Sequence, residues 1–258
     1  MKIASWNVNS LKVRLPQVLE WLDRHQPDIL GLQETKTTDE NFPVDILEAA
    51  GYGVTYAGQK TYNGVAVLSK RAIRDVVTEL PGLGDPQRRV LGATIGSGDD
   101  ALRFLNLYVP NGAEVGSDKY AYKLEWLAAL ERYLDRQLSE HQNLVVVGDF
   151  NIAPDDRDVH DPEEWRDKIL CSKPEREALR RLLDLGLSDC FRIFEQEEGI
   201  FSWWDYRAAG FRRNRGLRID LILASAAMSA RCTASYVDVE PRRLERPSDH
   251  APVVAEFS

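Results

Sequence analysis

The stretch LVVVGDFN, residues 144–151, carries the pattern that decides the fold. Its four apolar residues, Leu144–Val147, form an unbroken run that is short enough for a strand buried on both faces. The polar residues Asp149 and Asn151 follow where this strand ends. Ligands of open α/β sheets bind outside the carboxyl ends of strands, so the stretch predicts an α/β fold with both side chains facing a cleft.

Strand and helix patterns are mixed along the rest of the chain. Apolar runs between Gly, Asp and Pro residues predict further strands at 2–6, 29–32, 65–68, 90–95, 102–109, 217–223 and 253–257. Helical spacing of leucines predicts helices from about 11 to before Pro27, from about 117 to 138, and over 176–187. Because no long linker or repeat divides the chain, we predict a single domain over residues 1–258.

The composition excludes several classes of protein. The 258 residues are 43% apolar and 29% charged, which excludes a disordered chain, and no apolar run is long enough for a membrane span. The first residues show no charged-then-apolar leader, so we expect a cytoplasmic protein without a membrane partner. The net charge of −8 argues against coating nucleic acid by bulk charge, but it leaves room for a local basic face and a bound cation.

Four further polar clusters lie beside predicted strands. They contribute Asn7, Asn9, Glu34, Asp220, Asp249 and His250. Each cluster alone is explained by an ordinary turn or cap, but with residues 149–151 they supply one Glu, three Asp, three Asn and a His. Oxygen ligands without Cys or paired His suit Mg²⁺ or Mn²⁺ better than zinc. The clusters therefore predict a site for a hard divalent cation.

Seven motifs follow one another along the chain: NVN (7–9), LQETK (32–36), YVPNG (108–112), GDFN (148–151), FSWWDY (201–206), GLRID (216–220) and SDHAP (248–252). Together they resemble the exonuclease III family of DNA-repair nucleases, within the endonuclease/exonuclease/phosphatase superfamily. The resemblance implies a four-layer α/β sandwich, with two mixed sheets packed face to face between helices. It also implies a divalent-metal-dependent hydrolase of phosphate esters in duplex DNA, acting as 3′–5′ exonuclease, 3′-phosphatase or abasic-site endonuclease.

The resemblance and the side-chain chemistry together suggest a set of metal-binding residues. Glu34 is expected to bind Mg²⁺, with Mn²⁺ able to substitute. Asn7 is expected beside it and Asn9 as a weaker ligand. Asp249 is expected to hold the metal directly or through water.

Five residues are expected to carry the reaction. Asp149 orients or deprotonates the attacking water, and Asn151 fixes its geometry. His250 contacts the phosphoryl oxygen, and Asp220 pairs with it and raises its pKa. Tyr108 donates to the phosphate or protonates the leaving oxygen. The division of labour between Asp149 and Tyr108 stays open.

DNA contacts are expected from a basic loop beside Trp203. The loop contains Arg207, Arg212, Arg213, Arg215 and Arg218, and its extension is expected to include Lys36, Arg88, Arg89, Lys119 and Lys123. Asn111 is expected to donate to a phosphate.

The resemblance also implies an apolar pocket, formed by Trp203, Leu217 and Ile219, that accepts a flipped abasic sugar. Leu170 stands near a position where the family commonly has Gly or Ser. Its bulk predicts that trimming of blocked 3′ ends exceeds abasic-site incision.

Two other readings remain open. One is a Mg²⁺-dependent phosphatase of inositol phosphates or phospholipids on the same fold, and the other is a non-catalytic nucleic-acid-binding regulator. The arginine loop and the aromatic motif favour duplex DNA with abasic, nicked or 3′-blocked sites as the partner of a monomer.

Overall fold

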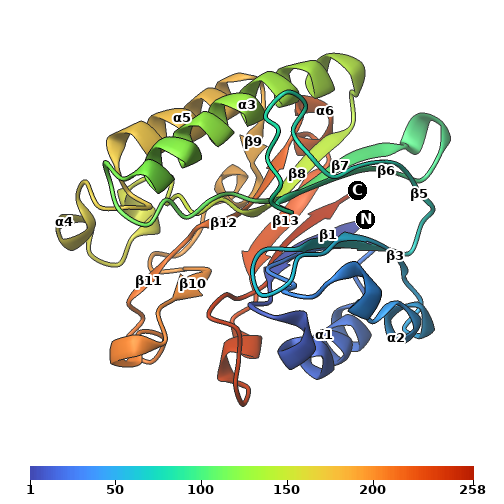
Figure 1. Ribbon diagram of the computed structural model, residues 1–258, viewed down its shortest axis with the longest axis horizontal. Coiled ribbons are helices and arrows are strands. Elements are labelled where there is room, and N and C mark those ends of the chain that lie inside the picture. The colour runs from blue at the N-terminus through green and yellow to red at the C-terminus, as the bar shows by residue number, and fades with distance from the viewer.

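Two six-stranded β-sheets stack face to face in the computed structural model, which describes residues 1–258 (Figure 1). Sheet A has the order β13-β14-β1-β2-β4-β3 and sheet B the order β5-β6-β7-β8-β12-β9. Sheet A consists of β1 (Lys2–Asn7), β2 (Ile29–Gln33), β3 (Gly53–Ala57), β4 (Val65–Ser69), β13 (Cys232–Val237) and β14 (Val253–Phe257). Sheet B consists of β5 (Ile73–Val77), β6 (Val90–Ile95), β7 (Leu102–Tyr108), β8 (Leu144–Asp149), β9 (Ser188–Asp189) and β12 (Asp220–Ala224). Both sheets mix parallel and antiparallel pairs, as the four-layer prediction requires.

Helices cover the outer face of each sheet (Figure 1). The chain forms the helices α1 (Leu11–His25), α2 (Val44–Ala49), α3 (Asp118–Glu140), α4 (Pro162–Trp165), α5 (Lys173–Asp184) and α6 (Ala226–Ser229). Helices α3 and α5 lie over sheet B, and α1 and α2 lie over sheet A. Single 3₁₀ turns occur at Asp39–Asn41, Gly98–Asp100, Asp156–Asp158, Cys190–Ile193, Arg207–Ala209 and Glu240–Arg243.

Strand β8 shows why an unbroken apolar run forms a central strand. Val145 and Val147 point into the core between the sheets, whereas Leu144 and Val146 point to the core beneath α3 and α5. Successive side chains of a strand face opposite sides, and here both sides are covered. The predicted doubly buried strand is confirmed.

The predicted helix starts and ends differ in accuracy. Helix α3 begins as predicted, because the Ser117 side chain caps it by accepting from the Tyr120 N–H. The predicted range 176–187 was wrong at both ends, since α5 spans Lys173–Asp184. Pro174 and a capping box between Ser172 and Glu175 place its start three residues earlier.

The predicted strand 217–223 was also wrong, because it is two elements. Gly216–Leu217 is β11, which pairs with β10 (Trp203–Trp204) outside both large sheets. Arg218 and Ile219 lie between β11 and β12, so the chain changes partner there. None of the helices has the combined length and apolarity that crossing a bilayer requires.

Candidate active site

The polar ends of several strands meet at one edge of the sandwich. Strands β1 and β2 run parallel and end at Asn7 and Gln33, immediately before Glu34. Strands β7 and β8 run parallel and end at Tyr108 and Asp149. The antiparallel strand β12 begins opposite Asp149 at Asp220. Distant segments of the chain therefore deliver their carboxylates to the same place.

Glu34, Asp149 and His250 form the centre of this site. One ligand atom from each lies within 4.8 Å of the others, and Asp149 and His250 are buried. The Asn7 amide donates to Glu34 Oε1 and to Asp149 Oδ2, both at 2.9 Å. This bridge holds the two carboxylates together, and we call the three residues the carboxylate–imidazole centre.

The imidazole of His250 lies between two aspartates. Its Nδ1 is 2.8 Å from Asp220 Oδ2, and its Nε2 is 3.7 Å from Asp149 Oδ2. Burial opposes protonation of His250, but the carboxylates of Asp220 and Asp149 outweigh it and raise its pKa to about 10. The imidazole is therefore cationic at neutral pH, and the predicted contact with Asp220 is present.

The pKa values of Asp149 and Tyr108 are also raised. Burial raises the pKa of the Asp149 carboxyl to about 7; the cationic His250 opposes this shift, whereas Asp220 and Glu34 add to it. Burial, with the Glu34 and Asp149 carboxylates nearby, raises the pKa of the Tyr108 hydroxyl well above its ordinary value. Tyr108 thus keeps its proton, and Asp149 can exchange one near neutral pH.

Of the four residues expected to bind metal, only Glu34 belongs to the carboxylate–imidazole centre. Asn7 directs its N–H groups to the carboxylates, and its oxygen accepts from the Asn9 N–H at 3.0 Å. Asp249 accepts from the Asn9 amide at 2.8 Å and from the Trp203 indole at 3.1 Å. Asn9 and Asp249 therefore form a hydrogen-bonded pair beside the centre.

Lys36 lies at this site, whereas the sequence suggested only a basic surface residue. Its ammonium is 2.8 Å from Glu34 Oε2 and donates to Asn9 Oδ1 at 2.5 Å. Its place two residues after Glu34, in the same motif, was the available signal. Because His250 is protonated, the metal ligands that the centre offers are the carboxylate oxygens of Glu34 and Asp149, and these fit a hard divalent cation.

Two asparagines form the wall beside Tyr108. The Asn111 amide donates to Asn151 Oδ1 at 3.0 Å, and the Asn151 backbone N–H donates to Asp149 Oδ1 at 2.9 Å. Asn111 also lines a cavity of about 440 Å³ together with Glu34 and Tyr108. A substrate in this cavity would lie beside the Glu34 carboxylate and within reach of Tyr108 and Asn111.

The residues expected around an apolar pocket do come together. Leu170, Leu217 and Ile219 belong to one buried cluster, against which Trp203 packs. The Leu170 side chain is only 4% exposed, and its backbone has a φ of 73°, a conformation that favours glycine. Leucine therefore fills space here that a glycine would leave open.

The arginine loop differs from the expectation at one residue. Arg218 is 1% exposed and binds Asp158 and Asp189, so its predicted DNA contact was wrong. Arg207 pairs with Asp205, and Arg215 pairs with Glu164. Arg212 and Arg213 are exposed and make no ion pair. The free positive charge of the loop thus lies at its tip.

Lys123 is likewise absent from the basic surface. Its side chain is completely buried and pairs with Glu175. The remaining residues of the expected extension, Arg88 and Lys119, are exposed, and Arg89 stacks over the Tyr108 ring at 4.7 Å.

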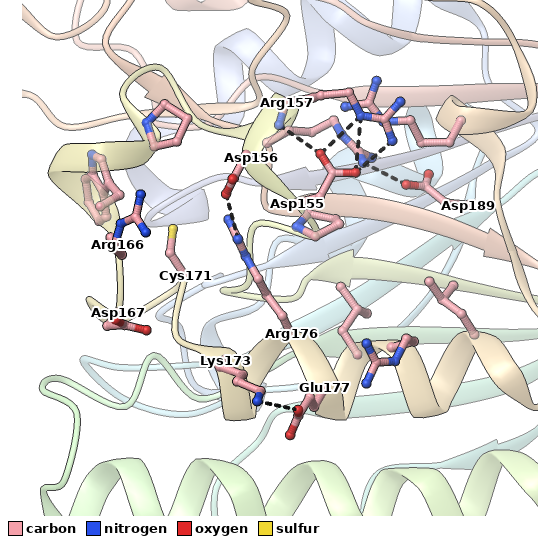
Figure 2. A pocket seen from close by; sticks show the side chains of 18 of the residues that line it. Asp155, Asp156, Arg157, Arg166, Asp167, Cys171, Lys173, Arg176, Glu177 and Asp189 are labelled. Carbon is pink, nitrogen blue, oxygen red and sulfur yellow. Dashed lines mark hydrogen bonds and ion pairs between the residues drawn. The ribbon is translucent and has the colours of Figure 1, made fainter.

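A cavity of about 900 Å³ lies apart from the carboxylate–imidazole centre, between the 3₁₀ turn 156–158 and α5 (Figure 2). Two of its acidic residues pair with arginines of the same lining, Asp155 with Arg157 and Asp156 with Arg176. None of Glu34, Asp149 and His250 lines it. We therefore place the chemistry at the strand ends.

A two-sheet sandwich with buried carboxylates and a cationic imidazole at one edge defines a hydrolase of phosphate esters. The chain belongs to the Endonuclease/Exonuclease/phosphatase family, whose model matches residues 4–250. It is similar to exodeoxyribonuclease III of Haemophilus influenzae, with 38% identity over 266 residues and complete coverage of both chains.

Solved structures give the same result. A 3′ phosphatase from Neisseria bound to a product DNA hairpin is 50% identical, with a TM-score of 0.97 and coverage of 100% of this chain and 99% of that chain. An AP endonuclease from Archaeoglobus fulgidus is 38% identical, with a TM-score of 0.95 and coverage of 100% and 99%. The predicted family, fold and enzyme class, a hydrolytic DNA-repair nuclease, are confirmed.

Proposed function

We propose that this nuclease uses Mg²⁺ to remove blocking groups and nucleotides from 3′ ends in duplex DNA, and that abasic-site incision is its weaker activity. The observation that carries the proposal is the convergence of Glu34, Asp149 and His250, next to a cavity that Glu34 and Tyr108 line. Glu34 would hold the cation, bordered by Asn9 and Asp249. When bound, the cation would polarise a phosphoryl oxygen and offset the charge of the phosphate.

The side chains divide the remaining work. Asp149, with a pKa near 7, takes the proton of the attacking water, while Asn7 and Asn151 hold its carboxylate in place. The cationic His250 stabilises the developing charge on the phosphoryl oxygen. Tyr108, which retains its proton, donates to the leaving oxygen, and Asn111 donates to the phosphate.

Leu170 supports the preference for 3′ ends. Its buried side chain packs with Leu217 and Ile219, where an abasic sugar would have to enter. The Neisseria relatives named for 3′-phosphatase and 3′–5′ exonuclease activity are 50% and 51% identical, against 38% for the AP endonuclease. We further propose that the protein acts as a monomer on nicked or 3′-blocked DNA.

One assay tests the function. Duplexes that carry a 3′-phosphate at a nick, a 3′-recessed end or an abasic site are compared at equal concentration, with Mg²⁺ and with EDTA. We expect hydrolysis only with the cation, fastest at the 3′-phosphate. Hydrolysis that persists in EDTA would contradict the metal site, and faster cleavage of the abasic duplex would contradict the preference.

A further inference from the structure

A buried ion pair lies behind the candidate active site, between α3 and α5. Lys123 Nζ is 2.5 Å from Glu175 Oε1, and both side chains are 0% exposed. Moving two charges out of water is costly, and apolar residues of the same volume would often be at least as stabilising. The two helices already share apolar contacts through Leu127, Leu130 and Leu179. Joining the helices therefore does not require this pair.

The ammonium binds two loops of the site. Besides Glu175, Lys123 Nζ donates to the backbone oxygen of Asn111 at 3.1 Å and to that of Asn151 at 2.7 Å. These residues follow β7 and β8, the strands that end at Tyr108 and Asp149. All three hydrogens of the ammonium are thus used, two of them on the loops that carry the site's asparagines.

The carboxylate binds a third loop. Glu175 Oε1 accepts from the Leu170 N–H at 3.1 Å, and Oε2 accepts from the Ser172 N–H and hydroxyl at 3.1 and 2.6 Å. Leu170 is the residue that fills the apolar pocket. The pair is hence fully hydrogen-bonded, and every partner outside the pair belongs to a loop at the site.

We propose that Lys123 and Glu175 are positioning residues for hydrolysis. They hold the loops 109–112, 150–153 and 168–172 in fixed positions relative to one another. Only one hydrogen bond separates these loops from a reacting group, because Asn151 donates its backbone N–H to Asp149 Oδ1. Both side chains are completely buried, so neither can reach the substrate directly. This inference rests on the proposed function, since its effect is on turnover.

The decisive variant is the double substitution Lys123→Met with Glu175→Gln, which removes both charges at nearly constant volume. The matched control, Arg181→Met with Glu131→Gln, makes the same kind of change in an ion pair on the surface of α5 and α3, which touches none of these loops. The two double variants are compared at a temperature where both are folded. In the Lys123/Glu175 variant, kcat for 3′-phosphate release should fall at least about tenfold, while KM stays within about threefold of the wild-type value. In the control variant, kcat should change less than about twofold.

Hydrogen–deuterium exchange gives a readout that does not need activity. In the double variant, amides of residues 150–153 and 168–172 should exchange faster, while the strands of both sheets keep their protection. Should the double variant not fold, Glu175→Gln alone should still lower kcat by more than about threefold and speed exchange at Leu170 and Ser172.

The outcomes separate the two proposals. A folded variant with unchanged kcat and unchanged loop exchange would overturn the positioning role. Lower stability with unchanged kcat per folded molecule would also overturn it, because it would show a purely structural pair. If the wild-type protein released no phosphate at all, the proposed function would fail, and loop exchange alone would still decide whether the pair holds the loops.

Discussion

Glu34 is the expected metal ligand that lies inside the carboxylate–imidazole centre, so its removal tests the site most directly. Glu34→Ala should lower kcat for 3′-phosphate release by at least about 10²-fold, because a cation ligand is lost. Glu48→Ala, which removes an exposed carboxylate on α2, should have no measurable effect. Steady-state kinetics in Mg²⁺ checks both, and a Glu34 variant with near wild-type kcat would exclude this carboxylate as an essential ligand.

At the neighbouring pocket, we expect Leu170 to control the choice between substrates. Leu170→Gly should raise the ratio of abasic-site incision to 3′-phosphate release by at least about tenfold, because even one methylene in an apolar pocket is worth about 1–3 kcal/mol of discrimination. Glycine also accepts the positive φ of this position without strain. The ratio is measured on one enzyme sample, so loss of stability cancels, and an unchanged ratio would count against the pocket as the source of selectivity.

At the scale of elements, a polar bridge joins the two sheets. Asn106 on β7 donates to the backbone oxygens of Leu32 at 2.8 Å and Ala66 at 2.9 Å, and accepts from Gln33 at 2.6 Å. Gly31 lies opposite, where a Cβ atom would come within 2.9 Å of Asn106 Oδ1. The register of β2 and β4 against β7 is thus fixed by directed hydrogen bonds inside an apolar core.

Asn106→Ala should therefore lower the free energy of unfolding by about 2–4 kcal/mol, because buried polar groups lose their partners and a cavity remains. Urea denaturation measures this change. Asn41→Ala, at an exposed turn, should change the free energy by less than about 0.5 kcal/mol. Equal stability of the two variants would show that the bridge contributes nothing.

At the scale of the whole molecule, a nuclease with a net charge of −8 acts on an anionic polymer, so we expect the unpaired arginines of the loop to supply the electrostatic attraction. Arg212→Gln should reduce the slope of log affinity against log salt by about 1, because one phosphate contact is lost. Arg136→Gln on α3 removes an exposed arginine far along the chain from the loop and should leave the slope unchanged. Titration of nicked DNA at several salt concentrations checks the difference, and equal slopes would argue against the loop as a DNA contact.

Local patterns determined much of this protein. The apolar run 144–147 specified a doubly buried strand, and Ser117 specified the start of α3. The polar clusters after β1, β2 and β8 marked the edge where the site forms. These features were predictable because a strand's burial and a helix cap depend on residues within a few positions of each other. The motif order was enough to identify the family.

Only the tertiary structure determined which charged side chains are buried and which acidic or basic groups they pair with. Lys123 and Arg218 were indistinguishable in sequence from surface cations, yet Lys123 pairs with Glu175, 52 residues away, and Arg218 pairs with Asp158, 60 residues away. The orientation of the Asn7 amide depended on Asp149, 142 residues distant. A side chain's charge and polarity are local properties, whereas its burial and its hydrogen-bond partner are set by segments that meet only after the chain has folded.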